Sequence, residues 1–306
     1  MKKFFTLIAA VFVAAANINA QTVTISKTDG TKILLKSNQI EKIEFGADKD
    51  QPKFLREFMG YILFSTKENQ NQYYGYGAKV SVYNTPTGKV SCIFKGGEWS
   101  KGYFDIVMDH GNISGKGVLT IARPMQDETD IYDAKIEGSM TNFKIIAGSM
   151  GDTIINWVYA KSEPLNYATQ GIYEGTDNIS VASQSYASNK TVGYQVTANA
   201  DGTINLIVPQ ISYENTLLGT IVVGTYTIPN IPYVESEKAF VKAYKDDKIP
   251  FHFKSNTMDG DYVMDSDVCR VVVRRTDTGY IELENNYQVG KMPFPVKGTF
   301  KGVSFR

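Results

Sequence analysis

Residues 217–228 read LLGTIVVGTYTI and carry the clearest structural pattern in the chain. β-Branched and aromatic side chains dominate this stretch, and such residues favour extended strands. Gly219 and Gly224 interrupt it, and glycine inside a strand is typical of a bulge or a sharp bend. Bends of this kind allow a sheet to curve and close on itself. The stretch therefore predicts a curved antiparallel sheet.

The sequence on both sides of this stretch has the same strand-like character. Apolar and polar residues roughly alternate at residues 80–82, 90–94 and 104–108, which is the period of a half-buried strand. Turn-forming residues separate such runs about every 8–12 residues, a spacing typical of a sandwich or barrel. The best helix candidate is short, residues 235–244 (ESEKAFVKAY), with Ser236 as its cap. The pattern predicts an all-β fold.

A polar stretch that contains a proline, residues 159–167 (YAKSEPLNY), divides the strand-rich part of the chain. The pattern restarts after it, so we expect a first β-domain over 54–160, which could be a degenerate barrel, and a second over 165–306. Residues 21–46 form an expected β-hairpin leader around an Asp-Gly turn. The predicted fold class is two tandem antiparallel β-barrels, or barrel-like sandwich domains, after this hairpin.

The first twenty residues have the pattern of a cleaved signal peptide. Lys2 and Lys3 precede an apolar run over 4–16, and a small residue, Ala20, precedes the expected cut. We therefore expect export to the periplasm, the cell surface or the medium. No later segment reaches the length of a membrane-spanning helix, so no transmembrane segment is expected.

Composition excludes several functional classes. The chain has 306 residues, and its 32 Lys and Arg balance its 32 Asp and Glu. It lacks the basic excess that nucleic-acid binding needs. Its two His and two Cys do not have the number or spacing of a zinc cluster. Cys92 and Cys269 could pair in an oxidising compartment, but buried strand thiols are the preferred interpretation.

The second half resembles a family of exported Bacteroidetes proteins, the calycin-like domain family that carries a lipid-binding label. The residues that carry the resemblance are Gly171-x-Tyr173-x-Gly175, Asp201-Gly202-Thr203-Ile204-x-Leu206, Leu218-Gly219-Thr220-Ile221-Val222-Val223, Ile228-Pro229-Asn230-Ile231-Pro232 and Lys297-Gly298-Thr299-Phe300-x-Gly302. The resemblance covers residues 165–306 and is weaker over 55–160, where the Ile-Pro-x-x-Pro element is missing. It implies a lipocalin-like barrel of about eight strands that encloses a small ligand.

The two histidines are better explained as strand and turn residues than as catalytic bases. His110 lies in a turn sequence, Asp-His-Gly-Asn, and no Gly-x-Ser-x-Gly elbow accompanies it. His252 lies between Phe251 and Phe253, so strand alternation directs it to the opposite face, towards solvent or a pocket.

Two acidic runs are candidates for a calcium site and for a catalytic site. Asp259, Asp261 and the aspartates that follow could hold calcium but lack EF-hand spacing, and the run 127–133 could supply carboxylates for glycoside hydrolysis. Solvated loops are the preferred interpretation of both. We therefore expect no catalytic residues, no metal and no cofactor.

Tyr73, Tyr74 and Tyr76 lie in the aromatic, amide-rich stretch NQYYGYG and are the candidate contact residues of an expected loop. They could stack on a sugar or cover one end of a barrel. Residues that bind a ligand inside a barrel cannot be assigned from sequence, because inward positions look the same in filled and hollow barrels.

These observations favour a secreted, non-enzymatic binding protein that holds a small apolar ligand or lipid in a β-barrel. The alternative is a surface adhesion or scaffolding module whose loops contact glycan or protein. An enzyme such as a glycan hydrolase ranks last, because it would need facing carboxylates or a histidine-centred site. A protein partner is not specified by the sequence.

Overall fold

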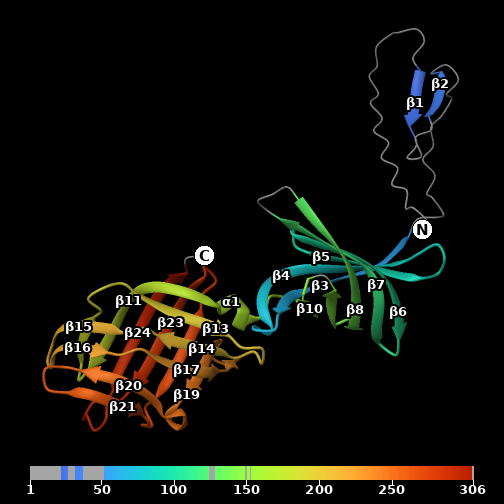
Figure 1. Ribbon diagram of the computed structural model, residues 1–306. Helices are drawn as coiled ribbons and strands as arrows, with labels where there is room; N and C mark the ends of the chain where they lie inside the picture. Colours follow the sequence, from blue (N-terminus) through green and yellow to red (C-terminus); the bar gives the residue numbers. More distant parts are fainter. Residues whose placement is uncertain are drawn as a thin grey trace. The chain divides into compact units, whose positions relative to one another are not determined.

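The computed structural model describes residues 22–26, 32–36, 52–123, 128–148, 150–151 and 153–304. The chain divides into two compact units, residues 1–52 and 53–306. In the first unit, β1 (Thr22–Ser26) and β2 (Lys32–Lys36) pair antiparallel, as expected for the leader hairpin (Figure 1). The expected signal peptide and the Asp-Gly turn lie outside the described residues.

A closed antiparallel barrel of eight strands begins the second unit (Figure 1, blue to green). Each strand pairs with the next along the chain, and β10 closes the ring by pairing with β3. The strands are β3 (Lys53–Ser65), β4 (Gln72–Asn84), β5 (Val90–Gly96), β6 (Ser100–Asp109), β7 (Asn112–Arg123), β8 (Glu128–Ser139), β9 (Asn142–Ala147) and β10 (Ile154–Tyr159).

Side chains fill the interior of this first barrel. Buried and accessible positions alternate along most of β6, as the period-two pattern predicts. The inward residues form one apolar cluster that includes Val80, Phe94, Phe104, Leu119, Ile136, Phe143 and Trp157, each at most 2% exposed. Trp157 stacks on Phe143 with ring centroids 4.9 Å apart and donates its indole N–H to the Ala78 carbonyl at 3.2 Å.

Two antiparallel sheets form the second barrel (Figure 1, yellow to red). The larger has the order β17-β14-β13-β11-β24-β23-β22-β19-β18, with β12 paired to β11, and the smaller has the order β15-β16-β20-β21. The strands are β11 (Gly171–Val181), β12 (Gln184–Ala187), β13 (Val192–Ala198), β14 (Ile204–Val208), β15 (Ile211–Thr216), β16 (Gly219–Val223), β17 (Tyr226–Ile231), β18 (Tyr233–Val234), β19 (Ala239–Ala243), β20 (Ile249–Lys254), β21 (Asp259–Met264), β22 (Arg270–Arg275), β23 (Tyr280–Tyr287) and β24 (Val296–Ser304).

One bent segment joins the two sheets into a nearly closed barrel. The stretch 217–228 leaves the small sheet as β16 and enters the large sheet as β17. The bend falls at Gly224, where a Cβ would lie 3.1 Å from the His252 Cβ, and the Gly224 N–H donates to the His252 carbonyl at 2.8 Å. Gly219 instead is the first residue of β16, directly after the turn at residues 217–218, with φ +79°. The prediction of two tandem antiparallel barrels is confirmed.

The prediction of a helix over residues 235–244 is wrong. Residues 239–243 form β19, which pairs with β18 and β22. Phe240 faces the main core, while Ala239 and Val241 pack with Val272 in a second small cluster. A strand buried on both faces loses the alternation that would identify it. The one α-helix among the described residues, α1 (Leu165–Thr169), follows Pro164 in the segment expected to be a boundary.

Cys92 and Cys269 are both free and buried, one in each barrel, as the preferred interpretation expected. Burial raises the pKa of the Cys92 thiol to about 12. A protonated thiol in this setting acts as a small apolar side chain. Neither cysteine therefore contributes to a candidate site.

Candidate functional site

A pocket of about 240 Å³ opens at one end of the second barrel. Its walls and floor come from inward-facing residues of five strands: Ile179 on β11, Ile221 and Val223 on β16, Phe253 on β20, Tyr287 on β23 and Val296 on β24. Its rim comes from the turn between β15 and β16 and from the segment between β23 and β24. The barrel thus supplies a concave apolar site of the kind that small hydrophobic molecules occupy.

Apolar side chains also stand exposed at the rim. Leu217 is 78% exposed and Phe294 is 51% exposed. Thr216, one of the few polar residues in the lining, donates its hydroxyl to the Gly219 carbonyl at 2.6 Å and accepts from the Leu218 N–H at 3.1 Å. Its hydrogen-bonding capacity is used in shaping the turn, so it adds little polarity to the pocket.

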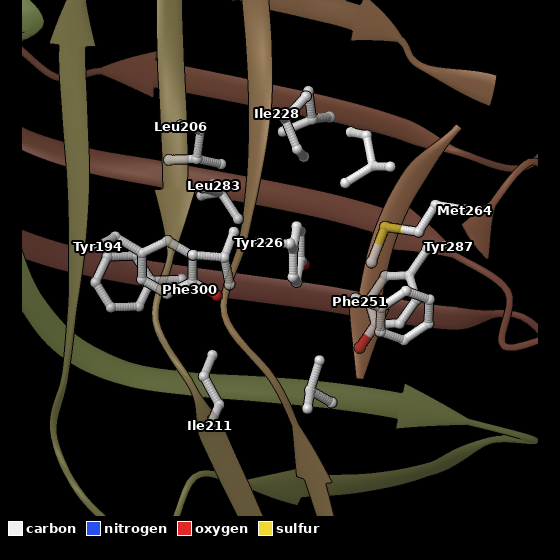
Figure 2. Close-up of a cluster of buried hydrophobic side chains, with 14 of the residues drawn as sticks. Tyr194, Leu206, Ile211, Tyr226, Ile228, Phe251, Met264, Leu283, Tyr287 and Phe300 are labelled. Carbon is white, nitrogen blue, oxygen red and sulfur yellow. The ribbon is translucent and has the colours of Figure 1, made fainter. Parts of the chain in front are cut away.

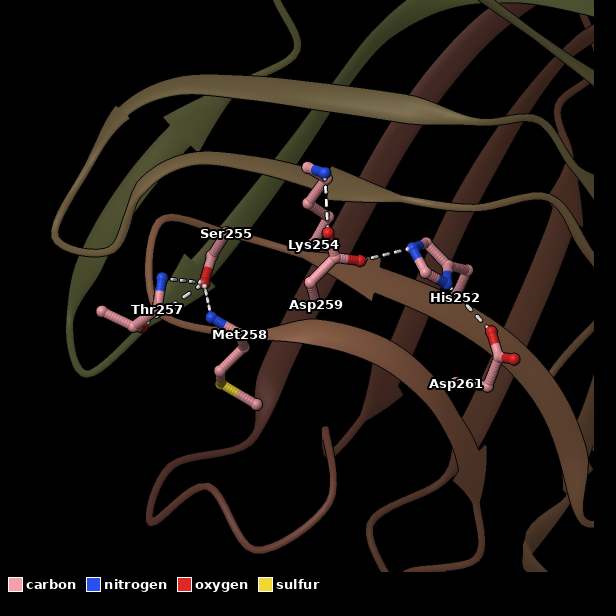
Figure 3. A network of polar contacts seen from close by, with 7 residues as sticks. All are labelled: His252, Lys254, Ser255, Thr257, Met258, Asp259 and Asp261. Atoms are coloured by element: carbon pink, nitrogen blue, oxygen red, sulfur yellow. Dashed lines mark hydrogen bonds and ion pairs between the residues drawn. The ribbon is translucent and has the colours of Figure 1, made fainter.

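The hairpin of β20 and β21 forms one wall, and polar contacts hold its turn in place (Figure 3). The Ser255 hydroxyl accepts hydrogen bonds from the backbone N–H groups of Thr257 and Met258, at 3.2 and 3.1 Å. Met258 is thereby fixed where its side chain lines the pocket. In this tight turn, the serine hydroxyl takes the place of a backbone carbonyl as hydrogen-bond acceptor.

Below the pocket, the interior of the second barrel is filled by side chains (Figure 2). Tyr194, Leu206, Tyr226 and Phe300 are each at most 6% exposed. A void of only about 10 Å³ remains beside Tyr194 and Tyr226, and it shares Ile179, Val223 and Tyr287 with the pocket above. These three residues separate an apolar mouth from a packed interior, so the cavity does not run the length of the barrel.

A buried carboxylate lies beside this void. Asp177 is 2% exposed and accepts hydrogen bonds from the hydroxyls of Tyr194, at 2.7 Å, and of Tyr213. Burial raises the pKa of the Asp177 carboxyl to about 6, against the opposing effect of the two tyrosine hydroxyls. The carboxylate is therefore ionised at neutral pH inside an otherwise apolar core.

The three candidate tyrosines lie on the first residues of β4, so their placement in a loop is wrong. Gly75 and Gly77, at φ +140° and +102°, let the strand continue through a segment with irregular register. The structure does not bring the three side chains into one surface. Tyr76 donates its hydroxyl to the Ala160 carbonyl at 3.4 Å.

Tyr73 and Tyr74 have different environments. Tyr73 stacks on Tyr167 at 4.2 Å between ring centroids and donates its hydroxyl to Glu163 at 2.5 Å. Tyr74 is 59% exposed and packs edge-on against Phe64 and Trp99, at 4.8 and 4.9 Å. Only Tyr74 of the three therefore offers an exposed ring for an external partner.

The acidic and histidine candidates form surface ion pairs. His252 contacts Asp261 through Nδ1 at 2.9 Å and Asp259 through Nε2 at 3.1 Å, and Lys254 contacts Asp259 at 2.7 Å (Figure 3). The hydrogen bond to Asp261 raises the pKa of His252. These aspartates belong to β21, not to the expected loop, and they contact His252 and Lys254 on β20.

The other candidates occupy turns or pairs. His110, with φ +46°, lies in the tight turn between β6 and β7 and contacts Asp109. In the run 127–133, Asp130 forms a two-point ion pair with Arg123, at 2.8 and 3.0 Å, while Asp127 lies outside the described residues. Within the described ranges, no group of three or more His, Cys, Asp or Glu side chains could hold a metal ion.

The rim of the pocket was not among the sites predicted from the sequence. Two features could have indicated it. Leu217 and Leu218 are apolar residues in the turn between two strands, directly before Gly219, and residues 292–295 read MPFP between two other strands. Apolar side chains in connections are unusual because connections face solvent, so they indicate a binding surface.

The fold and the pocket define a two-barrel protein of the calycin type, with an apolar site at the mouth of the second barrel. Residues 169–303, which contain the second barrel, match the model of the Calycin-like beta-barrel domain family. In the part of the chain that the structure describes, no helix is long and apolar enough to cross a membrane.

Solved structures with a similar fold include a protein from Bacteroides fragilis described as a "putative outer membrane protein". It is 15% identical, the match covers 81% of this chain and 97% of that chain, and the TM-score is 0.55. Transferrin binding protein B from Haemophilus parasuis matches at 9% identity over 93% of this chain and 85% of that chain, with a TM-score of 0.18 that supports no inference. The chain matches no curated protein.

Proposed function

We propose that this chain is an exported, non-enzymatic binding protein that takes a small apolar ligand, such as part of a lipid, at the mouth of its second barrel. The observation that carries the proposal is the apolar pocket of about 240 Å³. An apolar protein cavity of about 150 Å³ is large enough to bind benzene, so this pocket has room for a ring or a short acyl segment. Binding would be driven by burial of hydrophobic surface.

The residues that line the pocket support binding over catalysis. They include hydroxyl groups but no carboxylate, imidazole or thiol within the described part of the chain. Acid–base or nucleophilic catalysis needs such groups within hydrogen-bond reach of a substrate. Export is supported by the pattern of residues 1–20.

We expect Met292→Trp to abolish ligand binding, because the indole ring would occupy the pocket from its rim. Met292 is partly buried in the segment between β23 and β24, and it lines the pocket. Binding is measured by the fluorescence of N-phenyl-1-naphthylamine, which increases in apolar sites. We expect the affinity for this probe to fall at least about tenfold, the effect of losing roughly 1.4 kcal/mol.

Met108→Trp is the matched control, because Met108 is 51% exposed on the first barrel. It should bind the probe as the unchanged protein does. Equal binding by both variants and the unchanged protein would show that the probe does not use this pocket, and would refute the proposed site. Extraction of the protein purified from its own cells, followed by mass spectrometry, would identify the natural ligand.

A second candidate function, surface recognition of glycan or protein, is favoured by the exposed ring of Tyr74 on the filled first barrel. It packs against Phe64 and Trp99, which are partly buried. Exposed aromatic rings of this kind stack on the apolar faces of sugars. If this function holds, Tyr74→Ala should reduce binding on a glycan array about tenfold, while Tyr103→Ala, an exposed tyrosine elsewhere on the barrel, should not. An array that shows no binding by the unchanged protein would exclude a glycan partner.

A further inference from the structure

Among the described residues, one hydroxyl at the floor of the pocket has no hydrogen-bond partner. Tyr287 ends β23 and is 4% exposed, and its ring packs edge-on against Phe251 at 6.0 Å. Its hydroxyl makes no hydrogen bond within the described residues. The other two hydroxyl-bearing residues of the lining differ, because Thr216 bonds to its own turn and Tyr186 accepts from the Leu217 N–H at 3.3 Å.

The Tyr287 hydroxyl therefore borders empty space and is not sealed in the core. In the described part of the chain, every side-chain nitrogen or oxygen that is fully enclosed has a hydrogen-bond partner. The tyrosine lines both the pocket and the small void beneath it. A hydroxyl in this position lacks a hydrogen bond unless a water or a ligand supplies it.

A negative charge lies beneath the floor of the pocket. Asp177 lines the void that Tyr287 also lines, and its charge acts on the Tyr287 hydroxyl and raises its pKa, in addition to the larger effect of burial. No lysine, arginine or histidine is among the described residues that line the pocket or the void. An anionic group at the floor would meet a like charge with no cation to offset it, which is costly in an apolar interior.

We propose that the ligand of this pocket is a neutral amphiphile that enters with its polar end first and forms a hydrogen bond to the Tyr287 hydroxyl at the floor. Alcohols and amides have the required chemistry, whereas carboxylates do not. The apolar remainder of the ligand lies against Ile221, Phe253 and Met258, and its far end reaches Leu217 and Phe294 at the rim. This inference rests on the proposed function and specifies the class of ligand.

Three probes of equal chain length test the proposal: octan-1-ol, octanoate and 1-chlorooctane, each used to displace N-phenyl-1-naphthylamine at pH 8. For the unchanged protein we expect octan-1-ol to displace at the lowest concentration and octanoate at the highest. Tyr287→Phe removes only the hydroxyl. It should weaken octan-1-ol about five- to tenfold, the value of one net hydrogen bond of about 1 kcal/mol, and leave 1-chlorooctane unchanged.

Tyr280→Phe is the matched control, because Tyr280 starts the same strand, is 37% exposed and does not line the pocket. Unchanged 1-chlorooctane binding by Tyr287→Phe shows that the pocket is intact. Equal loss of octan-1-ol and 1-chlorooctane, no loss of either, or octanoate binding as tightly as octan-1-ol would overturn the inference and leave apolar binding standing. Failure of the fluorescent probe and all three compounds to bind the unchanged protein would overturn the proposed function as well.

Discussion

Replacement of Trp157 by alanine is expected to lower the free energy of unfolding of the first barrel by about 3–5 kcal/mol. Trp157 is 0% exposed and lies against Phe143 in the centre of the filled barrel. Truncation would remove its apolar contacts and leave a cavity, because strands on all sides restrict collapse. It would also leave the Ala78 carbonyl without the indole N–H that bonds to it at 3.2 Å.

The two tryptophans of the chain, Trp99 and Trp157, both belong to the first barrel, so tryptophan fluorescence reports on this barrel alone. Urea unfolding of Trp157→Ala would be followed through Trp99, and that of the control Trp99→Ala through Trp157. Trp99 is only partly buried, and its removal should cost about 1 kcal/mol. Equal midpoints for the two variants would contradict a core that depends on Trp157.

Replacement of Asp177 by asparagine is expected to remove a fall in stability that the unchanged protein shows as pH rises from 4 to 7. The folded pKa of Asp177, about 6, lies above the ordinary aspartate value of 3.8. Between these values the folded chain binds more protons than the unfolded chain, so stability decreases with increasing pH. The decrease ends once pH exceeds the folded pKa, and the total is on the order of 3 kcal/mol.

Asparagine has the shape of aspartate without its charge, and its amide can both accept from and donate to the hydroxyls of Tyr194 and Tyr213. The melting temperature should be measured at pH 4, 5, 6, 7 and 8 for the unchanged protein, for Asp177→Asn and for Asp265→Asn. Asp265 is an exposed aspartate of the same barrel and serves as the control. Parallel pH profiles for all three proteins would show that the Asp177 pKa is not raised by folding.

The all-β fold could be predicted because strand patterning is local. The run 217–228 contains its own bend, and Gly224 lies where the chain passes from one sheet to the other with the backbone close to His252. Only glycine, which has no Cβ, allows so close an approach of two backbones. A single residue type therefore marks the bend in the sequence. The role of Gly219 was harder to assign, because a turn and a bulge can both require glycine.

The error over residues 235–244 has a tertiary cause. Phe240 and Val241 point to opposite faces of a strand that is buried on both sides. Both faces therefore carry apolar residues, and the sequence lacks the apolar–polar alternation of a half-buried strand. Charged residues at 235–238 form the preceding turn, in which Lys238 has φ +49°. Spacing alone could not separate this arrangement from a short amphipathic helix, because the burial of both faces depends on partners distant in sequence.

The candidate site residues also depend partly on local sequence and partly on tertiary structure. NQYYGYG was recognised as aromatic, but only the fold separates Tyr74, which is exposed, from Tyr73, which stacks on a residue of α1. The pocket residues Ile179, Val223 and Tyr287 read as ordinary strand positions. They become a floor because β11, β16 and β23 meet at one end of the barrel.

The sequence by itself determined that the chain is built of antiparallel strands, that two β-domains follow a short hairpin, and that its cysteines and histidines have ordinary structural settings. These properties depend on residue periods, turn residues and composition, which are local. Tertiary structure decided where the apolar pocket opens, that the Tyr287 hydroxyl has no hydrogen-bond partner among the described residues, and that Asp177 is buried. Each of these depends on which side chains from distant strands meet, and closure of the sheets determines those meetings.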